Sequence, residues 1–181
     1  SPKPVPPTSL VQWEVFPQSV VEMLLKAVHA RMRIMVIGGI HGDELTSVSI
    51  VFRWMEWLGE AEPSQYHWRI VPLSNPDGLL ASPSRRTNGN GVDLNRNFPT
   101  PDWLTDALPY WKKRTKEDPR RFPGQKPMSE PETRWLHEEI ERFKPDAIVS
   151  IHAPYGILDY AGPAQEPRRF GGVSVETVIG I

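Results

Sequence analysis

The amino-acid sequence predicts an α/β fold, in which helices cover both faces of a mostly parallel or mixed central sheet in three layers. Three short runs dominated by apolar residues, at 33–37, 68–73 and 147–151, have the length of buried strands. Segments with apolar residues at helical spacing separate these runs. Strands that alternate with helices favour a parallel sheet, because each parallel connection must cross over the sheet.

The chain divides into a proline-rich segment at residues 1–10, which we expect to be extended or disordered, and a domain at residues 11–181. A first helix is predicted after Ser19 from apolar residues at helical spacing. These residues are Val21, Leu24, Leu25 and Val28. The first strand follows at Arg33–Ile37, and the glycine pair Gly38-Gly39 ends it.

A second helix is predicted directly after these glycines, with Glu44 in its first turn. Its expected inner face consists of Leu45, Val48, Phe52 and Met55. The second strand is predicted at Trp68–Leu73, and the turn-forming residues Ser74–Gly78 close it.

Residues 79–127 are rich in Gly, Pro and Asn and have few periodic apolar positions, so we expect a loop-rich segment. Ser129 and Glu132 have the spacing of a capping box at the start of a third helix. The apolar positions of this helix are Leu136, Ile140 and Phe143. Pro145 should end the helix, and Ala147–Ile151 should form a third buried strand.

Composition excludes several classes of protein. With 181 residues, of which 39% are hydrophobic, the chain is long enough for one globular domain. A net charge of −1 gives no indication of a nucleic-acid partner. No apolar run has the length of a membrane span, so we expect a soluble protein. The absence of cysteine excludes disulfides, thiolate metal ligands and cysteine nucleophiles.

The sequence leaves the oligomeric state and the cellular compartment open. The chain begins with Ser1 and has no apolar core typical of a signal peptide. This favours the cytoplasm, while the periplasm and secretion remain alternatives.

Three residues at predicted strand ends form a candidate metal site. His41 and Glu44 follow the first strand, and His152 follows the third. Ligands of parallel sheets bind beyond the carboxyl ends of the strands. Two histidines and a glutamate are typical ligands of one catalytic zinc ion, which keeps a further position open. Taken alone, the His-x-x-Glu pair would more simply be a surface histidine and a glutamate at a helix N-terminus.

Ordered motifs surround these three residues. They are Asn-Pro-Asp-Gly at 75–78, the run from Arg86 to Pro99, the run from Gly124 to Thr133, and Ser150–Gly156. This order resembles the M14 zinc carboxypeptidase family, most closely its bacterial murein peptide amidase branch. The resemblance extends from about Met32 to Pro163. That branch removes meso-diaminopimelate from γ-D-glutamyl linkages of cell-wall peptides.

The resemblance implies roles for individual residues. His41, Glu44 and His152 would be the zinc ligands, and Asp93 would orient the first zinc histidine. For Asp93 an alternative role is that of a turn residue that caps its own loop. The turn at 75–78 is expected to be structural and to deliver the loop that carries Arg86.

The resemblance also implies that the substrate is held by Arg86, Asn95 and Arg96. Arg86 would act in catalysis by polarising the scissile carbonyl and stabilising its oxyanion. Arg85 is a neighbouring alternative, but the spacing of nine residues to Asn95 favours Arg86. The planar fork of Arg96 and the amide of Asn95 suit a substrate carboxylate. The cationic stretch at 100–122 is expected to be a solvated surface, or a wall of the substrate cleft.

The function implied is that of a zinc-dependent metallocarboxypeptidase or amidase. It would hydrolyse a peptide bond next to a free carboxylate, in murein peptides that contain γ-D-Glu-meso-diaminopimelate, by attack of a zinc-activated water. The expected partner is a small peptide with a free carboxylate. A zinc-dependent deacylase of acylated amino acids is the alternative enzyme.

A catalytically silent module that binds zinc and peptides is a further alternative, because the general-base glutamate of the family is not recognised in this chain. Glu176 is superficially suitable, but residues 173–178 better resemble the strand that precedes the family's substrate loop. We therefore expect a catalytic domain that lacks its C-terminal strands. Zinc binding should survive such a truncation, whereas turnover by this chain alone is not expected.

Overall fold

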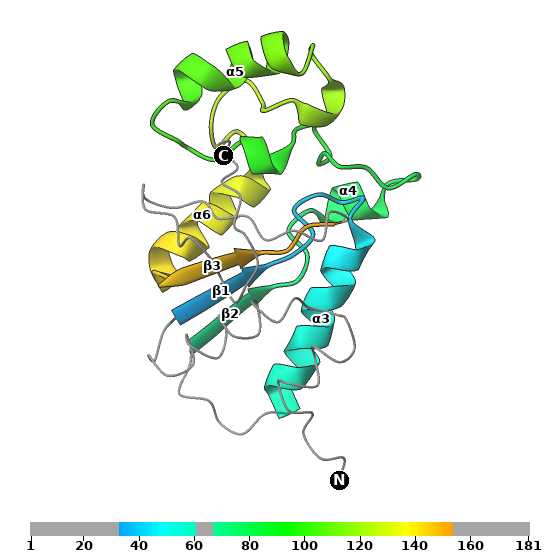
Figure 1. The fold of residues 1–181 in the computed structure, drawn as a ribbon, viewed down its shortest axis with the longest axis vertical. Coiled ribbons are helices and arrows are strands. Elements are labelled where there is room, and N and C mark those ends of the chain that lie inside the picture. Colours follow the sequence, from blue (N-terminus) through cyan, green and yellow to red (C-terminus); the bar gives the residue numbers. More distant parts are fainter. Residues whose placement is uncertain (1–32, 61–66, 154–181) are drawn as a thin grey trace, which may run out of the picture.

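The structure, a computed structural model of the chain, describes residues 33–60 and 67–153 (Figure 1). In order, its elements are β1 (Arg33–Ile37), α3 (Leu45–Glu60), β2 (His67–Val71), α4 (Pro76–Leu80), the 3-10 helix η1 (Leu94–Arg96), α5 (Trp103–Arg114), the 3-10 helix η2 (Pro119–Arg121), α6 (Pro131–Phe143) and β3 (Ala147–Ser150). The predicted proline-rich segment, the predicted helix after Ser19, and Glu176 lie outside the described residues. No helix within the described ranges has both the length and the apolar character needed to cross a bilayer.

The three described strands form one parallel sheet in the order β2-β1-β3. Ile34 of β1 pairs with Trp68 on one side and with Ala147 on the other. The α/β prediction is confirmed, and all three strands lie close to where the sequence places them. β1 has the predicted bounds, β2 begins one residue and ends two residues earlier than predicted, and β3 ends one residue earlier. Because the strands are parallel, their carboxyl ends meet at one edge of the sheet.

The central strand β1 is buried on both of its faces. Ile34 and Val36 pack with Val51 and Trp54 of α3. Met35 and Ile37 point the other way and pack with Leu136 of α6 and Val71 of β2. Figure 1 shows α3 and α6 flanking the sheet, so the three-layer arrangement is also confirmed. Burial of each large aliphatic side chain stabilises such a core by about 1.5–3 kcal/mol.

The predicted inner face of α3 is wrong except at Val48. Leu45, Phe52 and Met55 are 59%, 50% and 39% exposed. The buried face consists of Ser47, Val48, Val51 and Trp54. Helical periodicity identifies apolar stripes, but two neighbouring stripes of this helix are apolar, and packing against β1 selects between them. Glu44 also precedes the helix, and its carbonyl accepts a hydrogen bond from the Ser47 amide.

The prediction of a loop-rich segment at 79–127 missed the helix α5, which spans Trp103–Arg114. Pro109 lies inside this helix, where proline normally disfavours helical structure, and it obscured the pattern. Tertiary contacts stabilise the helix instead. The Trp103 indole donates to the Arg96 carbonyl at 2.7 Å, and the Trp111 indole donates to the Asp118 carbonyl at 2.8 Å.

The predicted capping box at the start of α6 is wrong. Glu130 occupies the N-cap position, and Ser129 donates its hydroxyl to the Glu130 carboxylate at 2.6 Å. The Glu132 carboxylate accepts from Asn88. The helix ends before Pro145, as predicted, with Lys144 in the left-handed conformation.

The expectation that β3 is fully buried is also wrong. Its residues alternate between half-buried and exposed, and Ile148 is 46% exposed. Among the described strands, β3 lies at an edge of the sheet, so one side of it has no paired strand within the described part of the chain.

Candidate metal centre

Two glycines allow the loop after β1 to turn toward the candidate metal site. Gly39 has a φ of +58°, a conformation that favours glycine. At Gly38 a Cβ atom would lie only 2.8 Å from Val51 and 3.0 Å from the Pro72 carbonyl oxygen. The glycine pair therefore lets the chain pass between α3 and the end of β2 before it reaches His41.

The predicted turn at 75–78 forms the start of α4 and holds two loops together. The Asn75 side chain is fully buried, and its amide donates to the Ile40 carbonyl at 3.3 Å and to the Arg86 carbonyl at 3.1 Å. Its oxygen accepts from the Gly78 amide at 2.8 Å. The turn thus delivers the Arg86 loop to the residue that precedes His41, as the sequence predicts.

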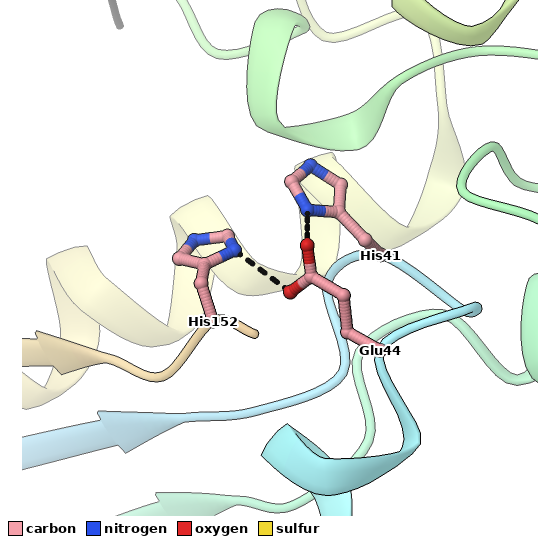
Figure 2. Close-up of side chains that lie close together, drawn as sticks. All are labelled: His41, Glu44 and His152. Atoms are coloured by element: carbon pink, nitrogen blue, oxygen red, sulfur yellow. Dashed lines mark hydrogen bonds and ion pairs between the residues drawn. The ribbon is translucent and has the colours of Figure 1, made fainter. Parts of the chain in front are cut away.

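His41, Glu44 and His152 converge at the carboxyl ends of β1 and β3. His41 Nδ1 lies 2.8 Å from Glu44 Oε1, and His152 Nδ1 lies 3.1 Å from Glu44 Oε2. Figure 2 shows the Glu44 carboxylate between the two imidazoles, with one oxygen directed at each ring. The candidate ligand atoms of the three residues all lie within 4.8 Å of one another.

The other nitrogen of each imidazole contacts a polar side chain. His41 Nε2 lies 3.2 Å from Asp93 Oδ1, and His152 Nε2 lies 3.2 Å from Ser150 Oγ. A carboxylate at Nε2 keeps a proton on that nitrogen and leaves the Nδ1 lone pair for a metal. Two imidazole nitrogens and one carboxylate are a donor set that suits zinc, so the residues present fit the predicted ion.

Asp93 makes the contacts expected for both of the roles that the sequence leaves open. Its carboxylate is fully buried, contacts His41, and accepts from Arg86 Nε at 2.8 Å. It also accepts from the Asn95 backbone amide at 3.1 Å, which caps the 3-10 helix η1. Asp93 therefore orients the histidine and fixes its own loop at the same time.

Contacts among His41, Glu44, Asp93 and their neighbours together outweigh the effect of burial on the pKa values of these three side chains. Burial lowers the pKa of His41, but its contacts with Asp93 and Glu44 outweigh burial and raise that pKa above the ordinary value. Burial raises the pKa of Glu44, but hydrogen bonds with His152 and His41 lower it to about 2. Burial also raises the pKa of Asp93, but the hydrogen bond with His41 and the charge of Arg86 outweigh burial and lower that pKa. Both carboxylates are therefore ionised near neutral pH.

The predicted substrate residues lie on the loop beside this group. A guanidinium nitrogen of Arg86 lies 4.0 Å from Glu44 Oε1. Arg85 instead donates to the Gly89 carbonyl of its own exposed loop, so Arg86 is the arginine that lies beside Glu44 and Asp93. Asn95 and Arg96 lie on η1 directly after Asp93, where the Arg96 guanidinium donates to the Asn95 carbonyl at 3.2 Å.

Comparison with known proteins identifies the family. A sequence profile of the family described as zinc carboxypeptidase matches residues 16–161. The chain belongs to the zinc carboxypeptidase family. The resemblance inferred from the motifs is thereby confirmed.

Relatives of this zinc carboxypeptidase family member include bacterial enzymes. It is 38% identical over 127 residues to murein peptide amidase A of Escherichia coli (strain K12), which covers 69% of this chain and 50% of that protein. It is 34% identical over 135 residues to murein peptide amidase A of Vibrio campbellii, which covers 73% of this chain and 52% of that protein. The chain therefore spans about half the length of the curated relatives it matches.

Solved structures show the same fold. Murein-tripeptide amidase MpaA from Escherichia coli O157 aligns with a TM-score of 0.51 and 33% identity over 71% of this chain and 54% of that chain. Carboxypeptidase A from Helicoverpa armigera aligns with a TM-score of 0.59 over 76% of this chain and 38% of that chain. At 22% identity, the second likeness concerns the fold alone.

The structure of this zinc carboxypeptidase family member adds residues that sequence reasoning missed. Ser150 contacts Nε2 of His152, and its position two residues before that histidine, at the end of the predicted strand, was an available signal. Asn88, Asn97 and Glu130 form a buried polar cluster that connects residues 86–97 to the start of α6. No local pattern predicts this cluster, because its partners lie more than thirty residues apart.

Proposed function

We propose that this protein is a zinc-dependent metallocarboxypeptidase or amidase that hydrolyses a peptide bond next to a free carboxylate. We propose murein peptides that contain γ-D-Glu-meso-diaminopimelate as its substrate class. The convergence of His41, Glu44 and His152, with Arg86 4.0 Å from Glu44, carries this proposal. The relatives named murein peptide amidase A support the substrate class.

His41, Glu44 and His152 would hold one zinc ion, which supplies Lewis-acid chemistry when it is bound. Asp93 keeps the His41 ring in a fixed orientation and also holds Arg86 Nε. The bond to Asp93 uses Nε and not the two terminal nitrogens of the guanidinium. Arg86 can therefore donate from a terminal nitrogen to a substrate carbonyl as negative charge develops on the carbonyl oxygen.

Arg96 and Asn95 would bind the free carboxylate of the substrate. A guanidinium presents two parallel donors to a carboxylate, and an adjacent amide adds a further donor. Both side chains lie half-buried on η1, directly after the carboxylate that holds Arg86. The scissile carbonyl and the free carboxylate would thus be held by neighbouring segments of one loop.

We place the general base outside the described residues. Within the described ranges, the carboxylates in contact with the two histidines are Glu44 and Asp93. Glu44 would bind the metal, and Asp93 holds the His41 ring and Arg86, so neither carboxylate is left to take a proton from water.

The first test is metal content. We expect elemental analysis of the purified chain under zinc-replete conditions to find one zinc ion per chain, and His41→Ala and His152→Ala to lose it. The matched control is His137→Ala on α6, which should retain zinc because His137 is not among the converging residues. A chain that binds no zinc would contradict the proposal.

The second test is hydrolysis of a murein tripeptide by the zinc-loaded chain, with mass spectrometry of released diaminopimelate. Zinc-dependent release supports the proposal. Hydrolysis of N-acetylaspartate without release of diaminopimelate would identify a deacylase instead. Tripeptide binding without release would show that this chain alone behaves as a silent zinc- and peptide-binding module, in line with a general base outside the described residues.

A further inference from the structure

Both substrate-binding segments are attached to the start of α6. The Arg86 segment is connected through Asn88, and the Asn95–Arg96 segment is connected through Asn97. Both asparagine side chains are almost fully buried, at 1% and 0% exposed. Residues so deep in the protein do not contact a substrate, so their effect on the site is one of position.

Asn88 is held at both ends of its side chain. Its oxygen accepts from the Asn90 and Val92 backbone amides at 3.1 and 3.0 Å, which fixes the orientation of the amide. Its nitrogen therefore faces α6, where it donates to Glu130 Oε2 at 2.8 Å and to the Glu132 carboxylate at 3.2–3.3 Å. The loop two residues after Arg86 is thus connected to α6.

Asn97 makes the equivalent connection for the second segment. Its oxygen accepts from the Glu130 backbone amide at 3.3 Å and from the Thr133 hydroxyl at 2.8 Å. Its nitrogen donates to the Pro123 carbonyl at 2.8 Å and to the Ser129 hydroxyl oxygen at 3.0 Å. Asn97 directly follows Arg96, so this bond set fixes the end of η1.

Glu130 is the residue common to both connections. The residue is 4% exposed, and its carboxylate accepts from Asn88, from Asn90 at 2.7 Å, and from the Ser129 hydroxyl at 2.6 Å. Its backbone amide donates to Asn97. No contact between Glu130 and Arg86 is observed in the described part of the chain, so any influence on the site passes through these asparagines.

We propose that Glu130 is a positioning residue that holds the Arg86 loop and the Asn95–Arg96 segment at a fixed separation. This inference rests on the proposed function, because the separation corresponds to the span between the scissile carbonyl and the free carboxylate of the substrate. Loss of the Glu130 carboxylate removes the nearest acceptor of the buried Asn88 amide. The loop that carries Asn88 and Arg86 must then rearrange to give this amide another partner. A misplacement of about 1 Å at such a site reduces turnover by about 100-fold.

The first test needs neither metal nor substrate. We would measure solvent exchange of the Arg86 Nε–H in the full chain by ¹⁵N NMR, with the buried β1 amides as an internal reference. Glu130→Ala should raise Arg86 Nε–H exchange at least about tenfold relative to β1, since the Asp93 bond is no longer held. Glu130→Gln keeps an acceptor for the asparagines and should restore slow exchange. The matched control Glu138→Ala, an exposed carboxylate of the same helix, should behave as wild type.

Three outcomes would overturn the inference. In the first, Glu130→Ala folds and its Arg86 Nε–H exchanges as slowly as in wild type. In the second, Arg86 exchange in Glu130→Ala rises only by the same factor as exchange of the β1 amides. In the third, Glu130→Gln does not restore slow exchange of the Arg86 Nε–H. If Glu130→Ala does not fold, Asn90→Ala removes one donor to Glu130 on an exposed loop residue. Asn90→Ala should raise the exchange rate of the Arg86 Nε–H by a smaller factor than is expected for Glu130→Ala. No rise in Asn90→Ala would overturn the inference.

The second test separates the inference from the proposed function. Titration of the zinc-loaded chain with a murein tripeptide should give weaker binding for Glu130→Ala at unchanged zinc content, and wild-type binding for Glu138→Ala. A wild-type chain that binds no tripeptide would contradict the proposed function, while the exchange measurement still decides the role of Glu130. Wild-type tripeptide affinity in Glu130→Ala would overturn the positioning role.

Discussion

Gly42 lies between the candidate ligands His41 and Glu44 and packs directly on the backbone of α4. A Cβ atom at this position would lie 2.2 Å from the Gly78 carbonyl carbon and 2.4 Å from the Leu79 amide nitrogen. Backbone atoms cannot move aside as a flexible side chain can. We expect Gly42→Ala to lower the free energy of unfolding by about 1–3 kcal/mol and to weaken zinc binding. Urea unfolding and zinc titration would measure the two effects.

Gly59→Ala is the matched control for Gly42→Ala. Gly59 lies in α3, and nothing lies within 4 Å of a Cβ atom placed there. Since alanine is the better helix former, we expect Gly59→Ala to leave zinc binding unchanged and to stabilise the protein by up to about 1 kcal/mol. If Gly42→Ala and Gly59→Ala had the same free energy of unfolding and the same zinc affinity, the contact of Gly42 with α4 would not matter as we expect.

Asp93 holds both His41 and Arg86, so its charge should matter more than its size. Asp93→Asn keeps the shape of the side chain but directs an amide group toward one of these two donors. We expect zinc affinity to fall about 10–100-fold, the range typical for loss of such an outer partner of a zinc histidine. Competition with a chelator would measure the affinity. Asp106→Asn, on the exposed surface of α5, should bind zinc as wild type does, and equal affinity of both variants would refute the role.

Glu130 should make stability depend on pH in the acid range. Burial raises the pKa of its carboxyl, but hydrogen bonds from Ser129 and two asparagines outweigh burial and lower that pKa. A lowered pKa means that Glu130 stabilises the fold above its ordinary pKa, and that this contribution is lost as pH falls toward the lowered value. Urea unfolding at a series of acid pH values should show a flatter profile for Glu130→Gln than for wild type. Parallel profiles for the two proteins would show that Glu130 does not contribute.

The helix α5 depends on a tertiary hydrogen bond at its first residue. Trp103 is 4% exposed, and its indole nitrogen donates to the Arg96 carbonyl at 2.7 Å. Trp103→Phe keeps an aromatic ring but removes the donor, so we expect a loss of about 1–2 kcal/mol in the free energy of unfolding. Urea unfolding monitored by circular dichroism would measure it.

An exposed ion pair on the same segment serves as the comparison. Arg120 of η2 donates to Asp43 at 2.8 Å, but the Arg120 side chain is 62% exposed. We expect Arg120→Ala to lower the free energy of unfolding by less than about 1 kcal/mol. This loss should be smaller still at high salt, which screens an exposed ion pair. A larger loss in Arg120→Ala than in Trp103→Phe would reverse our ranking of the contacts that hold the segment from α5 to η2.

Zinc binding should stabilise the whole fold, because the ligands join the ends of two strands. His41 and Glu44 follow β1, and His152 follows β3, more than a hundred residues later in the sequence. A ligand that binds the folded state alone at 100 times its Kd stabilises that state by about 2.7 kcal/mol. We expect chelation to lower the melting temperature and zinc to restore it. In His152→Ala the melting temperature should not respond to zinc, and a response equal to wild type would contradict ligation by His152.

The sequence alone predicted the three strands, their order along the chain, the turn at 75–78 and the strand-end positions of His41 and His152. These features follow from local properties, because strand runs, turn residues and helical spacing are written in neighbouring positions. The same local information identified the zinc carboxypeptidase family through its ordered motifs.

Only the tertiary structure decided which face of α3 is buried, that α5 is helical despite Pro109, and that Glu130 binds Asn88. Each of these depends on partners far away in the chain. Local periodicity cannot choose between two apolar stripes, because the position of the sheet makes that choice. Likewise, a buried asparagine or glutamate has no local signature, since its hydrogen-bond partner is known only once distant segments have packed together.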